Sequence, residues 1–490
     1  MPTICLSGWA SALLQGVQVQ VLFCRLSPAT SYRTAVVSCW SADEVQPLVA
    51  ALCGMRVAST RVGARTLVRR ATLLATMALA RATPFSPPAA PPRFPPSPVA
   101  ARVRVAFLGG LAGDALALAG HYEYDARIIA AKHGGSVTNY AAPGSNHGVG
   151  WGTANYHPGK VAGDLTDAGD VALITLEHVL DLAQRGERYT FDGLEAHWRA
   201  EIEERGYGAC NFISVGREHS GPCPAGLRPG YLNGGTRRTL EDVAAATARN
   251  GGVAPSGPAR MALAADVNCL VSATHFLPLF LLESDEAALA DAAVSTVFLS
   301  HKNRDPVAAA AFLARALHRL LHARAPLRQA LQGAADEGGD AFISACLANA
   351  VAKVEEVNAP GSALGALGAP YADDAACTSM ARLWDVGRSE PIKVGKASPT
   401  EGALPSALYF ALRYSDSLER ALIANANVGG DSAARGIVIG MLLGAAHADD
   451  PAAIPERWLT GLNARARVES LLRDVAAAAA AHGASDKSEL

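Results

Sequence analysis

The segment GIVIGMLLGAA (436–446) constrains the fold more than any other part of this sequence. Wound into a helix it is apolar on every side, so we expect it to be buried on all sides. Gly440 and Gly444 lie about one helical turn apart and would let a neighbouring helix approach closely. Half of the 490 residues are hydrophobic and only 18% are charged, which provides enough apolar side chains for a sizeable core around such a helix.

Further helices are predicted where apolar residues recur on one helical face. Alternating strand patterns are nearly absent, and no segment repeats at a fixed period. We therefore expect one mostly helical domain over residues 104–482, with long functional loops, followed by a polar tail at 483–490. Its other candidate helices are 171–183, 307–322, 404–423, 454–463 and 471–482, and 270–282 is expected to be a buried core element.

The first 103 residues differ in composition from the rest. No acidic residue lies between Glu44 and Asp114, and the stretch that begins at Met55 is rich in Arg, Ser and Thr, which is typical of an organellar transit peptide. The prolines of 84–98 favour an extended linker. We expect residues 1–103 to be a disordered extension that targets a plastid or mitochondrion; a tail without an address, and hence a cytoplasmic protein, is the alternative.

Charge and hydropathy argue against two classes of partner. The formal net charge is −2 and no basic stripe appears in the central or C-terminal sequence, so we expect no nucleic-acid binding. The apolar runs 71–80 and 270–282 are shorter than the roughly 20 residues of a membrane span, so we expect no membrane segment.

The nine cysteines have no regular spacing, which fits a reducing compartment. A zinc site from Cys210, His219 and Cys223 would match no standard pattern.

Oxygen-bearing side chains cluster in GDLTDAGD (163–170), directly before the predicted helix 171–183. Thr166 or Asp167 could cap that helix by accepting backbone N–H bonds, but a cap accounts for one residue and not for a cluster that includes Asp170. Carboxylate and hydroxyl oxygens are the ligands of hard cations such as Mg²⁺. The segment therefore favours a divalent-cation site with Thr166 and Asp167 as ligands, and a structural cap is the alternative.

The segment NVGGDSAARG (427–436) has the same arrangement, with polar residues that lead into a buried helix. Gly429 and Gly430 permit backbone conformations and a close approach that side chains forbid. Asp431 is either a helix cap or a metal ligand, and Arg435 is placed four residues later, where it could pair with Asp431.

Three further segments carry candidate site residues. GGLAGDALALAGHYEYD (109–125) is expected to be a loop that brings Asp114 and His121 to the site. His157 would either orient a substrate or bond to the backbone of its own loop. NGGTRR (233–238) is interpreted either as a phosphate cradle or as a surface turn.

The motifs NVGGDSAARG, GDLTDAGD and GDAL, with IPERW after the apolar helix, resemble those of the ADP-ribosylglycohydrolase family over roughly residues 105–465. The forms DALALAGHYEYD and NVGGDSAARG look closest to the branch that includes the J-crystallins of jellyfish lens. The resemblance implies an all-α, single-domain orthogonal helical bundle. It also implies two Mg²⁺ ions in a cleft lined by these loops, where they orient the ribose of an ADP-ribosyl group while its glycosidic bond is hydrolysed.

The middle motif of active family members reads Thr-Asp-Asp. Thr166 and Asp167 match it, and Ala168 stands where the second Asp is expected. Asp170 lies within a helical turn of that position and could substitute for it. It is also the best nearby candidate for activating the attacking water, because that role needs a carboxylate within reach of a solvent molecule.

The closing motif of active members reads Asp-x-Asp-Thr or Asp-x-Asp-Ser. Asp431 matches its first position, but Ala433 and Ala434 replace the second carboxylate and the hydroxyl. Two Mg²⁺ ions would be under-coordinated by Thr166, Asp167 and Asp431, so one ion or none is expected.

The sequence supports three hypotheses. The first is a hydrolase that cleaves a bond to ADP-ribose, in a small molecule or an ADP-ribosylated protein, with Asp167 and Asp431 holding Mg²⁺. The second is a non-catalytic member that binds a nucleotide-like ligand or is structural, as the lens crystallins are. The third is a metal-independent enzyme that uses the same cleft. The residues expected to contact the substrate are Asp114, His121, His157, Gly429 and Gly430.

Overall fold

The computed structural model describes three strands within residues 9–40 and then residues 92–143, 156–157, 159–208, 230–380 and 394–485. The chain divides into two compact units, Met1–Pro88 and Ala89–Leu490. All of the predicted site residues belong to the second unit.

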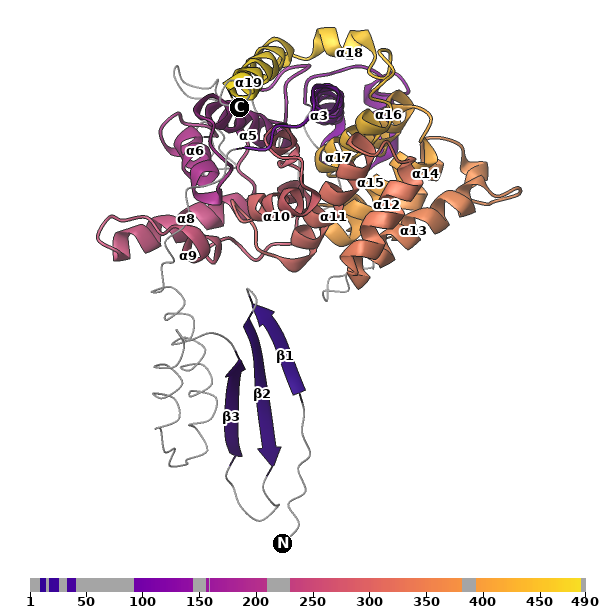
Figure 1. The fold of residues 1–490 in the computed structure, drawn as a ribbon. Helices are drawn as coiled ribbons and strands as arrows, with labels where there is room; N and C mark the ends of the chain where they lie inside the picture. Colours follow the sequence, from indigo (N-terminus) through magenta and orange to yellow (C-terminus); the bar gives the residue numbers. More distant parts are fainter. Residues whose placement is uncertain are drawn as a thin grey trace. The chain divides into compact units, whose positions relative to one another are not determined.

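The first unit contains a three-stranded antiparallel sheet (Figure 1). Strands β1 (Trp9–Leu14), β2 (Val17–Arg25) and β3 (Arg33–Trp40) are adjacent in the order of the sequence. The sequence predicted no regular structure for residues 1–103, although VQVQV at the start of β2 has the alternation of a strand. The transit-type stretch that begins at Met55 lies outside the described residues, so organellar targeting stays a prediction.

The described part of the second unit consists of helices and their connections and contains no β-strand, which confirms the predicted all-α fold. Its short 3₁₀ helices are η1 (Leu118–Gly120), η2 (Leu270–Ala273), η3 (Leu277–Leu281), η4 (Gly365–Leu367) and η5 (Val394–Lys396). Its α-helices are α3 (Ser97–Ala117), α4 (Ala126–Lys132), α5 (Asp167–Arg185), α6 (Phe191–Glu203), α8 (Gly234–Arg249), α9 (Gly257–Met261), α10 (Glu286–Val297), α11 (Arg304–Leu321), α12 (Leu327–Gly338), α13 (Ala341–Asn358), α14 (Tyr371–Met380), α15 (Thr400–Arg413), α16 (Leu418–Val428), α17 (Ser432–Ala446), α18 (Glu456–Gly461) and α19 (Arg465–Ser485).

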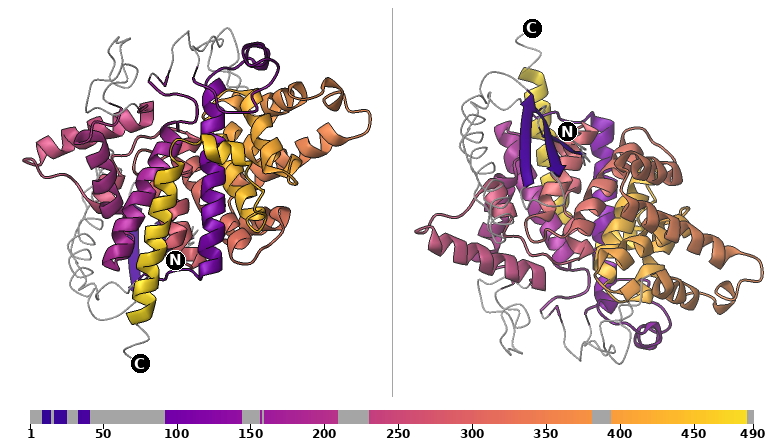
Figure 2. Two further views of the ribbon diagram at one scale, coloured as in Figure 1. Left: turned by 90° about the horizontal axis from the view of Figure 1, so that it is seen from above. Right: turned by 90° about the horizontal axis from the view of Figure 1, so that it is seen from below.

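Helices α3 and α17 pack closely against each other in the middle of this unit (Figures 1 and 2). Glycines make the contact: a Cβ at Gly440 would lie 2.1 Å from the carbonyl oxygen of Gly109, and a Cβ at Gly436 would lie 2.5 Å from that of Gly113. Side chains at these positions would force the helices apart, because the two backbones touch. The predicted role of Gly440 is confirmed, and Gly444 makes a third close contact with α3.

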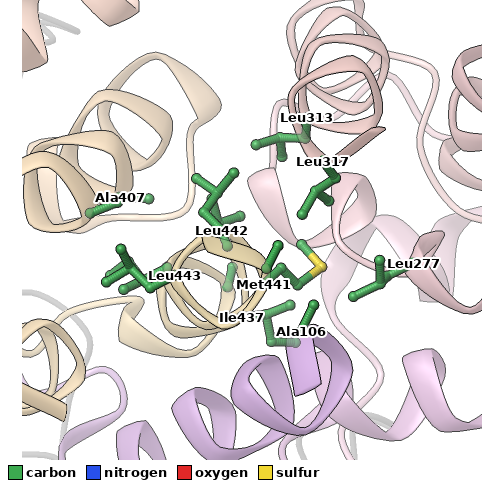
Figure 3. Close-up of a cluster of buried hydrophobic side chains, with 14 of the residues drawn as sticks. Ala106, Leu277, Leu313, Leu317, Ala407, Ile437, Met441, Leu442 and Leu443 are labelled. Atoms are coloured by element: carbon green, nitrogen blue, oxygen red, sulfur yellow. The ribbon is translucent and has the colours of Figure 1, made fainter. Parts of the chain in front are cut away.

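Helix α17 is buried on all sides, as predicted. Figure 3 shows how neighbouring elements surround it. Met441 lies toward Leu277 of η3, and Leu443 lies toward Ala407 of α15. Further core side chains in this view come from α3 and α11: Ala106, Leu313 and Leu317.

The predicted helices are confirmed with shifts at their ends, apart from the segment 404–423. This segment is divided between α15 and α16. The Ser417 hydroxyl accepts a hydrogen bond from Arg420 N (3.2 Å) and so starts a new helix. The segment 270–282 is buried, as predicted, and forms the turns η2 and η3.

Helix α3 begins at Ser97, before the predicted domain start at residue 104, because proline is accepted in the first helical turn. Together with η1 it spans Ser97–Gly120, and among the described residues it is the helix that is long and apolar enough to cross a membrane. Its most apolar window is 89% buried within the protein, as in a core helix.

Candidate functional site

Asp114 lies in the last turn of α3 and not in a loop as the sequence predicted. The glycines before it, such as Gly109 and Gly113, are typical of loops, but here they are helical and pack against α17. Asp114 is fully buried. Its Oδ2 accepts a hydrogen bond from Thr166 N (2.7 Å), and its Oδ1 accepts one from the Thr166 hydroxyl (2.5 Å). Helix α3 thereby fixes the segment that leads into α5.

Thr166 caps α5, which is one of the two interpretations that the sequence left open. Its Oγ1 accepts a hydrogen bond from Ala168 N (3.2 Å) and satisfies one of the free N–H groups at the helix start. The same hydroxyl donates to Asp114, so one lone pair remains for a ligand. The Asp167 carboxylate is therefore not needed as a cap. Its Oδ2 lies 3.4 Å from Asn233 Nδ2, and its Oδ1 has no hydrogen-bond partner among the described residues.

Two glycines bring Asp431 beside the segment that contains His121. Tyr122 N donates to Gly430 O (2.7 Å) and Gly430 N donates to Glu123 O (2.6 Å), so the two chain segments run side by side. Gly429 and Gly430 have φ values of 70° and 72°, in the left-handed region that favours glycine. A Cβ at Gly429 would also lie only 2.2 Å from Glu123 O. The backbone requires glycine at these positions, and their contact with a substrate stays a prediction.

The fully buried Lys396 holds these two chain segments together. Its ammonium donates to the carbonyl oxygens of Tyr124 (2.7 Å) and Val428 (3.2 Å) and pairs with Asp374 (2.5 Å). Its own carbonyl oxygen accepts a hydrogen bond from Asp431 N (2.7 Å). The sequence gave no reason to single out Lys396, because a lysine outside any motif is normally a surface residue.

The Asp431 carboxylate does not cap α17, and it forms no ion pair with Arg435. Its Oδ1 lies 3.0 Å from His121 Nε2, and His121 Nδ1 lies 2.7 Å from His157 Nε2. Because a carboxylate only accepts, His121 Nε2 donates to Asp431. Burial, reinforced by the charge of His121, holds the pKa of His157 well below its usual range, so this imidazole is neutral. Arg435 instead donates to backbone carbonyls and to Asn425 Oδ1 (2.9 Å).

Burial raises the pKa of the two inner carboxyl groups. The pKa of Asp167 rises from 3.8 to about 7, mainly because the group is buried; His121 opposes this rise, and the charges of Asp431 and Asp114 add to it. The pKa of Asp114 rises to about 6, since burial outweighs its hydrogen bonds from Thr166. Buried carboxylates that disfavour each other's charge create a place where a cation would be stabilised.

Asp170, the predicted water-activating residue, lies in the first turn of α5. Its Oδ2 accepts hydrogen bonds from Lys160 Nζ (2.7 Å) and from the Tyr207 hydroxyl (2.9 Å). These two donors fix the direction of the carboxylate. Its Oδ1 has no hydrogen-bond partner among the described residues and is the atom that water activation would need.

Aromatic rings line one side of this site, a feature that the sequence analysis missed. The Tyr122 ring centroid lies 3.9 Å from that of His121 and 4.7 Å from that of Tyr156, which in turn lies 5.7 Å from that of Tyr231. Tyr122 has a φ of 67°, a conformation that costs a residue other than glycine about 1–3 kcal/mol. The available signal was that HYEY, NYHP and PGYLN place tyrosines in the same segments as the polar candidates.

Asp167 also lines a cavity of about 10 Å³, together with Tyr231 and Asn233. This volume is close to the smallest that holds one water molecule. The Asn233 side chain accepts a hydrogen bond from Thr236 N (3.0 Å) and caps α8. The segment 233–238 therefore starts a helix at the edge of the site and is not the surface turn that one interpretation predicted.

The site does not hold a ready-made group of three close protein ligands. In the described ranges, no three ligand atoms from its His, Asp and Glu side chains lie within 4.8 Å of one another. A cation bound by Asp167 and Asp431 would need water molecules to complete its shell, as Mg²⁺ usually does. The conceivable zinc group of Cys210, His219 and Cys223 lies outside the described residues.

Comparisons with known proteins give a family match and one structural likeness. The family model described as ADP-ribosylglycohydrolase matches residues 95–485. No curated protein matches this chain. A solved structure described as an ADP-ribosylglycohydrolase-related protein complex is 20% identical, with a TM-score of 0.46 and coverage of 78% of this chain and 100% of that one.

Proposed function

This chain belongs to the ADP-ribosylglycohydrolase family, and we propose that it hydrolyses a glycosidic bond to ADP-ribose or a related ribosyl nucleotide with the help of a divalent cation. One observation carries the proposal. The start of α5 and the residue before α17, far apart in sequence, bring Asp167 and Asp431 into one buried polar cluster with Asp114 and His121. The substrate is an ADP-ribosyl small molecule or an ADP-ribosylated protein.

The donor set fits a hard cation such as Mg²⁺. Burial is the main cause of the raised pKa of Asp167, and the charge of Asp431 adds to it, so a cation between the two carboxylates would favour their charged forms. Asp167 Oδ1 and Asp431 Oδ2 have no hydrogen-bond partner among the described residues, and the Thr166 hydroxyl keeps one lone pair. When bound, Mg²⁺ would polarise and orient the ribose hydroxyls.

The chain's own residues have separate roles in this proposal. Asp170 accepts the proton of the attacking water at Oδ1, while Lys160 and Tyr207 hold its other oxygen. His157 and His121 hold Asp431 in place through their hydrogen-bonded chain. The backbone at Gly429 and Gly430 lets the ribose approach without side-chain interference.

Release of ADP-ribose tests this function. ADP-ribosylated arginine, ADP-ribosylated serine and O-acetyl-ADP-ribose are offered with Mg²⁺ to the wild-type protein and to Asp170→Asn. We expect release from at least one substrate and a loss of roughly 10²-fold or more in Asp170→Asn, the size of a general-base contribution. Release that is equal in both proteins would remove Asp170 from the mechanism. Release that persists undiminished in EDTA would favour the metal-independent enzyme.

A non-catalytic member, either nucleotide-binding or crystallin-like, is the second candidate. Ala168, Ala433 and Ala434 stand where active members carry ligands, and each is only 1% exposed. Apolar methyl groups at these positions reduce the number of oxygens available to a second ion. Saturable binding of ADP-ribose without release from any of the three substrates would support this candidate. The likeness to the J-crystallin branch and the organellar location both stay predictions.

A further inference from the structure

We propose that His178, Asp181 and His197 bind a transition-metal ion such as Zn²⁺ where α5 and α6 pack together. Each of these residues offers one ligand atom, and the three atoms lie within 4.8 Å of one another. Imidazole nitrogens and carboxylate oxygens are the ligands that Zn²⁺ takes, whereas Mg²⁺ prefers oxygen alone. His178 lies about 16 Å along α5 from Asp167 at 1.5 Å per residue, so this is a separate site and does not rest on the proposed function.

Two rigid helices supply the ligands. His178 and Asp181 are three residues apart on α5 and share a face of that helix, and His197 comes from α6. His197 Nδ1 lies 3.6 Å from Asp181 Oδ2, and the two imidazole centroids lie 5.5 Å apart. Ligand atoms on a tetrahedral zinc ion are about 3.4 Å apart when each bond is about 2.0–2.1 Å long. Small side-chain rotations would therefore bring the three ligand atoms within bonding distance of one ion.

The two histidines carry buried nitrogens that the rest of the protein does not use. The Nε2 atoms of His178 and His197 are both buried and have no hydrogen-bond partner in the described structure. Buried polar atoms normally have a partner, so these two atoms show that the protein's own hydrogen bonds do not use either imidazole fully. His178 is only 3% exposed, and its ring packs against Gly193 of α6, where a Cβ would lie 3.3 Å from Cε1.

The charge state of the rings also suits a metal. Burial, with a smaller contribution from His197, lowers the pKa of His178 to about 4, and burial lowers the pKa of His197. Both imidazoles are then neutral at neutral pH, which is the form that coordinates metal ions.

Asp181 is a better third ligand than the neighbouring glutamates. Glu177 and Glu201 also lie near His197, but they are paired with Arg467 and Arg205 respectively. The Asp181 side chain is 47% exposed, so a fourth position on the ion would open to solvent and take water. An ion here would join α5 to α6 and stabilise the folded unit, because the three ligands come together only when both helices are packed.

The test uses the full-length protein in buffer without Mg²⁺. Zn²⁺ is titrated by calorimetry, Co²⁺ is titrated by visible absorption, which reports four-coordinate nitrogen and oxygen ligation, and Tm is measured with and without Zn²⁺. We expect one Zn²⁺ site that raises Tm. His178→Gln and His197→Gln should each weaken the binding by at least about tenfold and remove the Tm rise, since even residues outside the ligand shell commonly contribute that much.

The matched control is His133→Gln, which removes a half-buried histidine on another helix terminus and should leave Zn²⁺ affinity unchanged. If His178→Gln does not fold, His197→Gln decides, because the His197 side chain is 17% exposed and tolerates replacement more readily. The proposal would be overturned if His197→Gln matched the wild type in Zn²⁺ affinity, in its Co²⁺ spectrum and in the rise of Tm. None of these measurements depends on ADP-ribose release or on Mg²⁺, so the two proposals fail independently.

Discussion

Helices α3 and α17 meet in two regions that differ in chemistry. Along most of their contact the two backbones touch through Gly109, Gly440 and their neighbours, with apolar side chains around them. Near the end of α3 and the start of α17 the same pair presents Asp114 and Asp431, both buried. The glycine contact has no polar side chain to satisfy, whereas the polar end holds buried carboxylates at a cost in stability. The glycine contact fixes how the two helices lie, and the positions of Asp114 and Asp431 depend on that arrangement.

The largest expected effect is in the glycine contact. Gly440→Leu should lower the free energy of unfolding by more than about 4 kcal/mol, or prevent folding, because the added Cβ would overlap a backbone carbonyl that cannot move without separating the helices. Denaturant unfolding followed by circular dichroism measures this. The control Gly338→Ala adds a Cβ in a helical position with only the far end of Arg315 nearby, and should be neutral or slightly stabilising. A stable Gly440→Leu variant would show that the glycine contact does not hold the fold.

The polar end should instead make stability depend on pH. In metal-free protein, burial raises the pKa of Asp167 to about 7, so protonation of this carboxyl favours the folded state. Its contribution to stability is fully present below 3.8, the pKa in the unfolded chain, and is lost as the pH rises through 7. Asp167→Asn removes this loss and should be more stable than wild type at pH 8 by roughly 2–4 kcal/mol, but not at pH 4. Unfolding curves at both pH values in EDTA measure the difference. Parallel pH profiles for the two proteins would contradict the buried, charged environment of Asp167.

A hydrogen bond from Thr166, the cap of α5, holds Asp114 at the polar end of α3. Thr166→Val removes a helix cap and leaves Asp114 Oδ1 without its donor, so we expect a loss of about 2 kcal/mol in unfolding free energy. Thr190→Val removes the cap of α6 at an exposed position, where only about 1 kcal/mol is expected. Equal losses in the two variants would mean that the Asp114 contact contributes nothing to stability.

The smallest effect is expected at Ser432. Its side chain is fully buried, but its hydroxyl has no hydrogen-bond partner among the described residues. Ser432→Ala should therefore leave the unfolding free energy unchanged or raise it by up to about 1 kcal/mol, since no bond is lost and a buried polar atom is removed. A clear destabilisation would show that this hydroxyl does have a hydrogen-bond partner in the folded protein.

The sequence predicted the glycine contact better than the polar end. The apolar helix 436–446 and its glycines could be identified because periodicity and the absence of side chains are local properties. Asp114 was assigned to a loop because helical glycines that pack on a distant helix resemble loop glycines in one sequence. The bond between Asp431 and His121 and the clamp at Lys396 depend on contacts between distant segments, which residue spacing does not encode.

The proposed function requires that Asp167 and Asp431 hold the same divalent cation. Mg²⁺ titration by calorimetry on the wild type, Asp167→Ala, Asp431→Ala and the double variant tests it most directly. We expect each single substitution to abolish millimolar Mg²⁺ binding. The double variant should be no worse than either single one, because one ion has already been lost. Mg²⁺ binding that persists in either single variant, or no binding in the wild-type protein, would show that the two carboxylates do not share an ion.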